Sequence, residues 1–290
     1  MSDPAGNLML VYEDNAFGPS HVHGQVRSPD NQPLFNALVV SSTGDQYRPA
    51  ICSDGGSGAL VFYEAYVPDQ YSIGVTRFSA WGTPIAGHPV TFAPDQIDGH
   101  TVIADGAGGA WLEWQSTTTN LLHVNSAGYP AAGWPTAGIP LANDPPTSMT
   151  RDEGDGVIVA MRPGGQPGAL RYSSSGQVVA GWDPDGTVSS SGMYDMALVA
   201  DGRGGAIVGG TDPRNQASTG QDLYVQNVDR FGKLGDASPS IAGVRDVPND
   251  QGGRVRLSWN PSYLDASPAH GIASYLVFRQ IPAAVAASLL

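Results

Sequence analysis

The chain has 290 residues, 41% of them apolar, which is enough for a substantial buried core. Glycine (38) and proline (23) are abundant, and only residues 283–290 show even weak helical spacing of apolar residues, so many short strands joined by turns are expected. The net charge of −13, with one lysine, argues against nucleic-acid partners and anionic membranes. No run reaches the ~18 apolar residues that a membrane-spanning helix needs.

One short pattern recurs along the chain. Its clearest copy is Asp105-Gly106-Ala107-Gly108-Gly109-Ala110, followed by an apolar stretch. The copies start at Asp3, Asp54, Asp105, Asp152 and Asp201, which are 51, 51, 47 and 49 residues apart. The first copy matches the pattern less well than the others. A period near 50 residues is typical of propellers, solenoids or arrays.

Each copy follows the same order of predicted elements. A short apolar strand ends at the aspartate, and the glycine-rich turn, a strongly apolar strand, a polar loop and an alternating third strand follow. In chain order the predicted strands include 21–26, 47–53, 59–63, 72–78, 89–92, 100–104, 110–114, 121–124, 146–151, 169–172, 193–200 and 222–228. Trp134 and Trp182 share a position with His88, six residues beyond a turn glycine, and open a fourth strand.

Four short strands per repeat are the make-up of a propeller blade. We therefore predict an all-β fold in which residues 1–242 form a β-propeller of five four-stranded repeats, or a fragment of a larger ring. The repeats span about 3–52, 53–103, 104–150, 151–199 and 200–242. Residues 239–244 are the segment placed to complete the ring by pairing with the other terminus.

The pattern changes in residues 243–290. Residues 254–259 and 272–279 alternate as strands do, and we expect 255–259 to pair with 274–279. Ser258-Trp259 and Ser274-Tyr275-Leu276-Val277-Phe278-Arg279 resemble the opening strands of a fibronectin type III domain. Such a sandwich needs about 100 residues. We therefore expect a partial domain that is loosely attached, with residues 283–290 poorly packed.

The repeats themselves resemble the uncharacterised Asp-Gly-x-Gly-Gly propeller repeats of secreted bacterial proteins. Those repeats are often followed by fibronectin-like modules and a surface-sorting tail. The resemblance implies export and display at the cell surface, although the printed start has no signal peptide. It brings no catalytic residues with it.

Several residues invite a functional interpretation but favour a structural one. The repeated aspartates are expected to accept backbone N–H groups in their own turns, because calcium needs six or more oxygens. Cys52 is expected to be a buried thiol, and His21 with His23 lack a third metal ligand. Trp134 and Trp182 are expected to pack between repeats, with stacking on sugars as the alternative. No cofactor or metal is predicted.

Aligning the repeats places a set of polar residues at one end of the apolar strand. Those of the first four repeats are Glu13, Glu64, Gln115 and Arg162, preceded in the first three by Tyr12, Tyr63 and Trp114. Equivalent positions of successive blades lie around the axis, so these residues are predicted to form a ring at one mouth of the channel. The ring is either a site for a neutral polar ligand or a solvated rim.

The function predicted from these features is non-catalytic recognition or display outside the cell, with a glycan or a protein bound through a propeller face. One alternative is a polysaccharide-active enzyme, a glycoside hydrolase or lyase, that uses Glu13 and Glu64 as its carboxylate pair. A second alternative is a structural spacer. Neither nucleic-acid binding nor membrane insertion is expected.

Overall fold

The structure is a computed structural model. It describes residues 1–278 except 17, 39–43, 69, 80–83, 86–88, 93–96, 142–147, 163–165, 183–191, 236–237, 250, 252–253 and 267–271. The chain divides into two compact units, Met1–Gly235 and Asp236–Leu290. Each unit is described by itself below. His88 and residues 283–290 lie outside the described residues.

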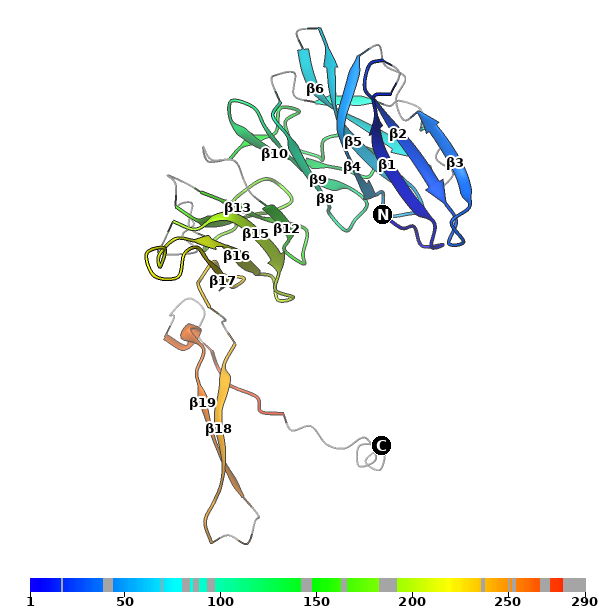
Figure 1. Cartoon of the computed structure of the whole chain (residues 1–290). Coiled ribbons are helices and arrows are strands. Elements are labelled where there is room, and N and C mark those ends of the chain that lie inside the picture. The colour runs from blue at the N-terminus through cyan, green and yellow to red at the C-terminus, as the bar shows by residue number, and fades with distance from the viewer. Residues whose placement is uncertain are drawn as a thin grey trace. The chain divides into compact units, whose positions relative to one another are not determined.

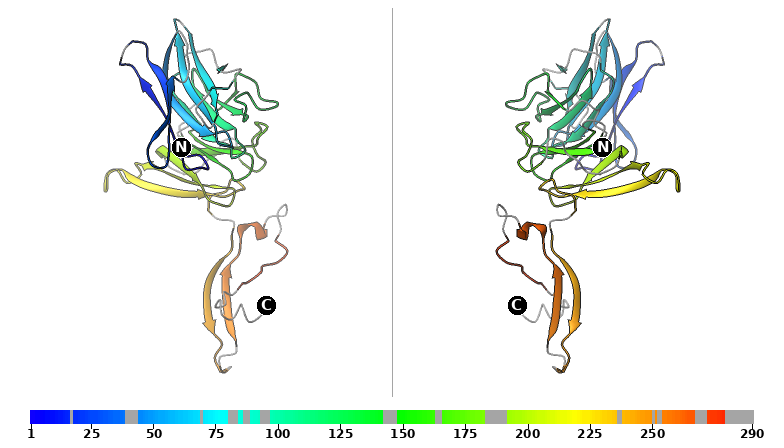
Figure 2. Two further views of the ribbon diagram at one scale, coloured as in Figure 1. Left: turned by 90° about the vertical axis from the view of Figure 1, so that its right-hand side faces the viewer. Right: turned by 90° about the vertical axis from the view of Figure 1, so that its left-hand side faces the viewer.

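The first unit contains five small antiparallel sheets, which follow one another in chain order (Figures 1 and 2). Sheet A holds β1 (Leu8–Asp14), β2 (His21–Arg27) and β3 (Pro33–Leu38). Sheet B holds β4 (Asp45–Ser53), β5 (Ala59–Val67), β6 (Gln70–Phe78) and β7 (Val90–Phe92). Sheet C holds β8 (His100–Ala104), β9 (Ala110–Gln115), β10 (Thr119–Val124) and β11 (Ile139–Pro140). Sheet D holds β12 (Ser148–Arg151), β13 (Val157–Met161) and β14 (Gly168–Tyr172), and sheet E holds β15 (Tyr194–Ala200), β16 (Ala206–Asp212) and β17 (Asp222–Val228).

The all-β prediction is thus confirmed, and each sheet contains one copy of the aspartate turn. The first strands of sheets B to E lie mostly before the predicted repeat boundaries, so each of these sheets begins one strand earlier than the predicted repeat. Sheets B and C have the four strands that were predicted, whereas the described residues of sheets A, D and E form three. Among its described residues, sheet A lacks the first strand of the repeat, which in the other sheets precedes the repeated aspartate. Most of the segment expected as the fourth strand after Trp182 lies outside the described residues.

The repeated aspartate organises the turn that joins the first two strands of a sheet. In sheet C, the Oδ1 of Asp105 accepts the backbone N–H groups of Ala107 and Gly109, at 2.7 and 2.9 Å. Gly106 and Gly108 have positive φ angles of 82° and 96°, a conformation that glycine adopts without strain. His123 of β10 pairs with the Oδ2 of Asp105 at 3.0 Å. The structural interpretation of the repeated aspartates is therefore confirmed.

The same arrangement recurs in other repeats. A polar side chain of the third strand contacts the second carboxylate oxygen of the aspartate, and the pairs are Arg77 with Asp54, Arg171 with Asp152 and Asn227 with Asp201. In the worn first copy this oxygen is bound by Asn7, within the turn itself. The turn between the first and second strands is thereby bonded to the third strand, and this contact helps to fix the register of the three strands.

Every sheet has two faces, because successive residues of a strand point to opposite sides. We call the face toward the next sheet in the chain the forward face and the opposite one the back face. In sheet B the forward face includes Leu60 and Phe62, which join the core cluster that contains Trp111 of sheet C. The back face includes Val61 and Tyr63, which pack with sheet A. The cores therefore lie between successive sheets, and the first strands β4, β8, β12 and β15 contact one another in turn.

Two tryptophans connect neighbouring sheets. The indole N–H of Trp134 donates to the carbonyl of Ser174, at 2.6 Å, in the turn after β14. The indole N–H of Trp182 donates in the same way to the carbonyl of Arg230, at 3.1 Å, in the turn after β17. Both side chains are buried. The prediction that they pack between repeats is confirmed.

The second unit differs from the prediction. β18 (Ser240–Asp246) pairs with β19 (Val255–Asn260), with Ile241 opposite Trp259. The expected pairing of residues 255–259 with 274–279 is wrong, because residues 272–278 form no strand. Residues 239–244 were expected to complete the ring, and residues 240–244 of this segment pair with β19. A hairpin partner close in sequence closes a shorter loop than either alternative and loses less entropy.

The rest of the second unit is a turn and an extended segment. The 3₁₀ helix Tyr263–Ala266 is the one helical segment among the described residues of the chain. The hydroxyl of Tyr275 donates to the Oδ2 of Asp265, at 2.7 Å, and accepts the N–H of Ser262. Over the ranges described above, the chain contains no helix long and apolar enough to span a membrane.

Candidate functional site

The site begins with a bulge in the first strand of sheet B. The pairing of β4 with β5 shifts between Tyr47 and Ala50, and Arg48 within the bulge has a positive φ of 49°. The same repeat position has a positive φ in sheets C and E, at Gly99 and Asp195. A non-glycine residue in this conformation is strained, and bulges of this kind redirect a side chain.

The redirected Arg48 contacts three carboxylates. Its backbone N–H donates to the Oε2 of Glu13 at 3.2 Å, and its Nη1 lies 3.3 Å from the Oε1 of Glu64. The same Nη1 lies 3.9 Å from the Oδ1 of Asp98. One arginine thus holds side chains that precede, belong to and follow sheet B.

These residues line a hollow with a volume of about 440 Å³. We call it the acidic hollow, and it is lined by Glu13, Tyr47, Arg48, Glu64, Tyr71 and Ile97. Desolvation and a hydrogen bond with Asp45 raise the pKa of Tyr47 above its ordinary value. Two carboxylates and one arginine line the hollow, and Asp98 lies beside that arginine, so the net charge here is negative.

The two glutamates of the acidic hollow lie in different surroundings. Glu64 is buried, and its Oε1 lies 3.3 Å from the Nδ1 of His100, a side chain that is itself buried. Glu13 is exposed, and its Oε1 accepts the hydroxyl of Ser20 at 2.8 Å. One carboxylate is therefore fixed inside the protein, and the other is in contact with solvent.

The remaining members of the predicted ring lie elsewhere. Gln115 and Arg162 are not among the residues that line the acidic hollow. Tyr12 is on the back face of sheet A, where it stacks on His23 with ring centroids 5.6 Å apart. Tyr63 and Trp114 are buried in the cores between sheets.

This separation follows from strand geometry. Each aromatic residue precedes its polar neighbour by one position, so the two side chains point to opposite faces of the sheet. The aromatic rings at the acidic hollow are instead those of Tyr47 and Tyr71. The alignment missed Tyr47, Arg48, Tyr71 and His100. One available signal was that Tyr47 and Tyr194 both precede a repeated aspartate by seven residues (54 − 47 and 201 − 194).

Other polar residues that could carry chemistry lie outside the acidic hollow. Burial raises the pKa of the Cys52 thiol to about 12, so it stays protonated, as expected of a packing residue. Burial also raises the pKa of Glu113 to about 8, against a smaller lowering by Thr101. Among the residues given above as described, no group of three or more His, Cys, Asp and Glu side chains is arranged to hold a metal ion.

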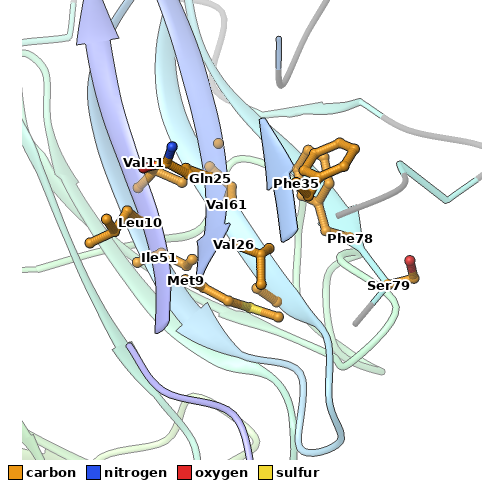
Figure 3. Close-up of a pocket in the computed structure, with 12 residues that line it drawn as sticks. Met9, Leu10, Val11, Gln25, Val26, Phe35, Ile51, Val61, Phe78 and Ser79 are labelled. Carbon is orange, nitrogen blue, oxygen red and sulfur yellow. The ribbon is translucent and has the colours of Figure 1, made fainter. Parts of the chain in front are cut away.

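A second pocket lies between sheets A and B (Figure 3). Its lining is almost entirely apolar and includes Met9, Val26, Phe35, Val61 and Phe78. Its volume of about 20 Å³ is room for little more than one water molecule. We interpret it as imperfect packing between two sheets rather than as a ligand site.

Comparison with known proteins gives distant structural similarity. No protein-family model matches the sequence, and no curated protein matches it. A protein of unknown function from Bacteroides caccae is 14% identical, with 74% of each chain covered and a TM-score of 0.42. The GH43 endo-arabinanase from Bacillus licheniformis is 12% identical, covering 81% of this chain and 95% of its own, with a TM-score of 0.36.

A GH43 β-xylosidase/α-arabinofuranosidase from a compost microbial metagenome is 9% identical, covering 79% of this chain and 89% of its own, with a TM-score of 0.35. Glycoside hydrolases predominate among the matched structures. The prediction of a non-catalytic recognition or display protein has no counterpart among these glycoside hydrolases and is not retained.

Proposed function

We propose that this chain is a glycoside hydrolase that acts on neutral polysaccharide at the acidic hollow. The observation that carries the proposal is the placement of Glu13 and Glu64, from neighbouring sheets, in one hollow with Arg48 between them. Glycoside hydrolysis needs two carboxyl groups that flank the scissile bond, one to donate a proton and one to act as nucleophile or base.

The surroundings of the two glutamates suggest their roles. Glu64 is held by Arg48 and His100, and a fixed carboxylate suits attack on the anomeric carbon or on a water molecule beside it. Glu13 is exposed, so it can exchange its proton with solvent between turnovers. Tyr47 and Tyr71 also line the hollow, and aromatic residues of this kind suit the binding of a sugar.

The charge of the hollow supports a neutral substrate. Glu13, Glu64 and Asp98 surround the single Arg48, so an anionic sugar would be repelled. A lyase acts on uronic acid residues, which carry a carboxylate. For this reason we favour hydrolysis of neutral glycans over the lyase chemistry of the original alternative.

The proposal extends to architecture and location. Sheets A to E are taken as blades of a β-propeller, and residues 243–290 as a fibronectin-like segment. The support is the recurring strand order and the mutual contact of β4, β8, β12 and β15. Because polysaccharides are found outside the cell, we place the protein there or on the cell surface.

The test is hydrolysis of a panel of neutral polysaccharides that includes arabinan, xylan and β-1,3-galactan. Glu64→Gln and Glu13→Gln should each lower the rate by at least about 100-fold, because each removes a reacting carboxyl group. Glu153→Gln, the same change at an exposed glutamate in a turn of sheet D, should leave the rate unchanged. The anomer released first distinguishes a retaining from an inverting pair.

Hydrolysis that survives in both variants would place the catalytic residues elsewhere. A wild-type chain that binds and cleaves none of these glycans would overturn the proposal and leave the structural-spacer alternative. Circular dichroism of each variant verifies that loss of activity is not loss of folding.

A further inference from the structure

Both ends of the series of sheets present an apolar face that no other described residue of the first unit covers. Between these ends, the forward face of each sheet packs against the back face of the next, as in the core cluster shared by sheets D and E. Four such interfaces join the five sheets. The back face of sheet A and the forward face of sheet E are left over.

The back face of sheet A has the residue types of a covered face. Leu8, Leu10 and Tyr12 hold the repeat positions of Ala59, Val61 and Tyr63 in sheet B. Those three residues of sheet B are at most 2% exposed, whereas Leu8, Leu10 and Tyr12 are 41%, 37% and 41% exposed. On β1 the sequence pattern is therefore that of an interface, and polar residues of β2, namely Arg27, Gln25 and His23, lie opposite it on the same face.

The forward face of sheet E shows the same contrast. Ile207 holds the position of Trp111 in sheet C and Ile158 in sheet D, both fully buried, yet it is 38% exposed. Val199 lies opposite Ile207 on β15, and Leu223 and Val225 follow on β17, and all three are more exposed still. The strands β15, β16 and β17 thus expose four apolar side chains on one face, with Asn227 beside Ile207 and Thr211 beside Leu223. Exposed apolar side chains gathered on one face indicate an interaction surface.

We propose that these two faces bind each other between copies of this chain, so that the protein assembles head to tail. The identity of the binding partner follows from the interfaces within the chain, each of which joins a forward face to a back face. The described residues of the first unit leave one uncovered face of each kind, and a second copy supplies the missing member of both pairs. Such an interface continues the existing series of sheets from one molecule into the next.

The contact is heterologous, since the two surfaces are different parts of the chain. Copies joined in this way close into a ring or extend into a filament, depending on the rotation between them. Carboxylates placed in either face should prevent the contact, because a buried charge without a partner is strongly unfavourable.

The test is light scattering with size-exclusion chromatography on the full chain over a range of concentrations. The wild type should form dimers or larger species, and Val225→Asp and Leu10→Asp should each weaken self-association by roughly tenfold or more. Val178→Asp, at a partly exposed valine in the turn after β14, is the matched control and should associate like the wild type.

Mixing the two variants identifies the geometry. Val225→Asp keeps a normal back face and Leu10→Asp a normal forward face, so the mixture should form a dimer with one intact interface although neither variant associates alone. Like-to-like pairing would instead leave one variant fully associated by itself. That result, or a wild type that is monomeric at every concentration because another part of the same chain covers these faces, would overturn the proposal.

Discussion

Met1–Gly235 and Asp236–Leu290 are both built from antiparallel strands with alternating apolar residues, yet they bury those residues to very different extents. In sheet C, Leu112 and Trp111 on opposite faces of β9 are both fully buried, because sheets lie on either side. On β19, Val255 and Trp259 share one face and remain 62% and 46% exposed. The comparison teaches that alternation makes a strand, while burial requires a neighbouring sheet. A two-stranded ribbon alone is marginally stable at best.

The largest difference should be in resistance to protease. We expect a nonspecific protease to remove residues 236–290 well before it cuts the repeats, because few side chains of the second unit are buried. Mass spectrometry of the fragments over time reports the order of cleavage. Cleavage of both units at equal rates would mean that the second unit is as well packed as the first.

Replacing one tryptophan in each unit by alanine compares how much a buried and a half-exposed ring contribute to stability. Trp111 stacks on His123 with ring centroids 4.2 Å apart and contacts the edge of Trp134, so Trp111→Ala should destabilise the first unit by about 3–5 kcal/mol. Trp259→Ala should cost about 1 kcal/mol or less, since this ring is half exposed.

Hydrogen exchange read out by segment measures the two tryptophan effects separately. Exchange in β8 to β10 should accelerate in the first variant, and exchange in the repeats should not change in the second. If Trp111→Ala lowered stability less than Trp259→Ala, the first unit would not be the better packed of the two.

The pH dependence of stability should also distinguish the units. Burial raises the pKa of Glu113 from 4.5 to about 8, so between these values the folded state binds a proton that the unfolded state has lost. Stability of the first unit therefore falls as the pH rises from about 4.5 to about 8, by at most about 1.4 kcal/mol per pH unit, and levels off above. Glu113→Gln, which has no carboxyl to ionise, should flatten this slope.

Urea unfolding at several pH values measures the slope. Glu153→Gln is the control at an exposed position, and the slope of stability against pH should be the same in this variant as in the wild type. A wild-type profile that is flat between pH 5 and pH 8 would show that Glu113 is not buried as described.

The smallest expected difference concerns one aspartate in each unit. Asp105→Ala leaves the N–H groups of Ala107 and Gly109 without their acceptor and should cost about 1–3 kcal/mol. Asp265→Ala removes one exposed contact with the Tyr275 hydroxyl and should cost about 1 kcal/mol or less. Equal losses in thermal unfolding would argue that the aspartate turn contributes no more than an exposed hydrogen bond.

Local features of the repeats were predictable because their causes are local. The aspartate accepts N–H groups two and four residues away, and the glycines that follow it allow the positive φ angles that the turn needs. Alternation likewise predicts the strands, and β8 and β17 have the expected bounds. The partner of β19 was not predictable in this way, since residues 239–244 were assigned to the ring and 272–279 was the alternating segment left to pair with it.

The site shows the same division. Sequence periodicity by itself determined that Glu13 and Glu64 occupy equivalent positions in neighbouring repeats, and both do line the acidic hollow. Only the tertiary structure decided that Arg48 joins them, because the bulge that redirects its side chain depends on the pairing of β4 with β5. Tertiary structure also decided which aromatic rings face the hollow. A side chain's position along the strand follows from the sequence, but the face that it shares with residues of other sheets follows from how those sheets pack.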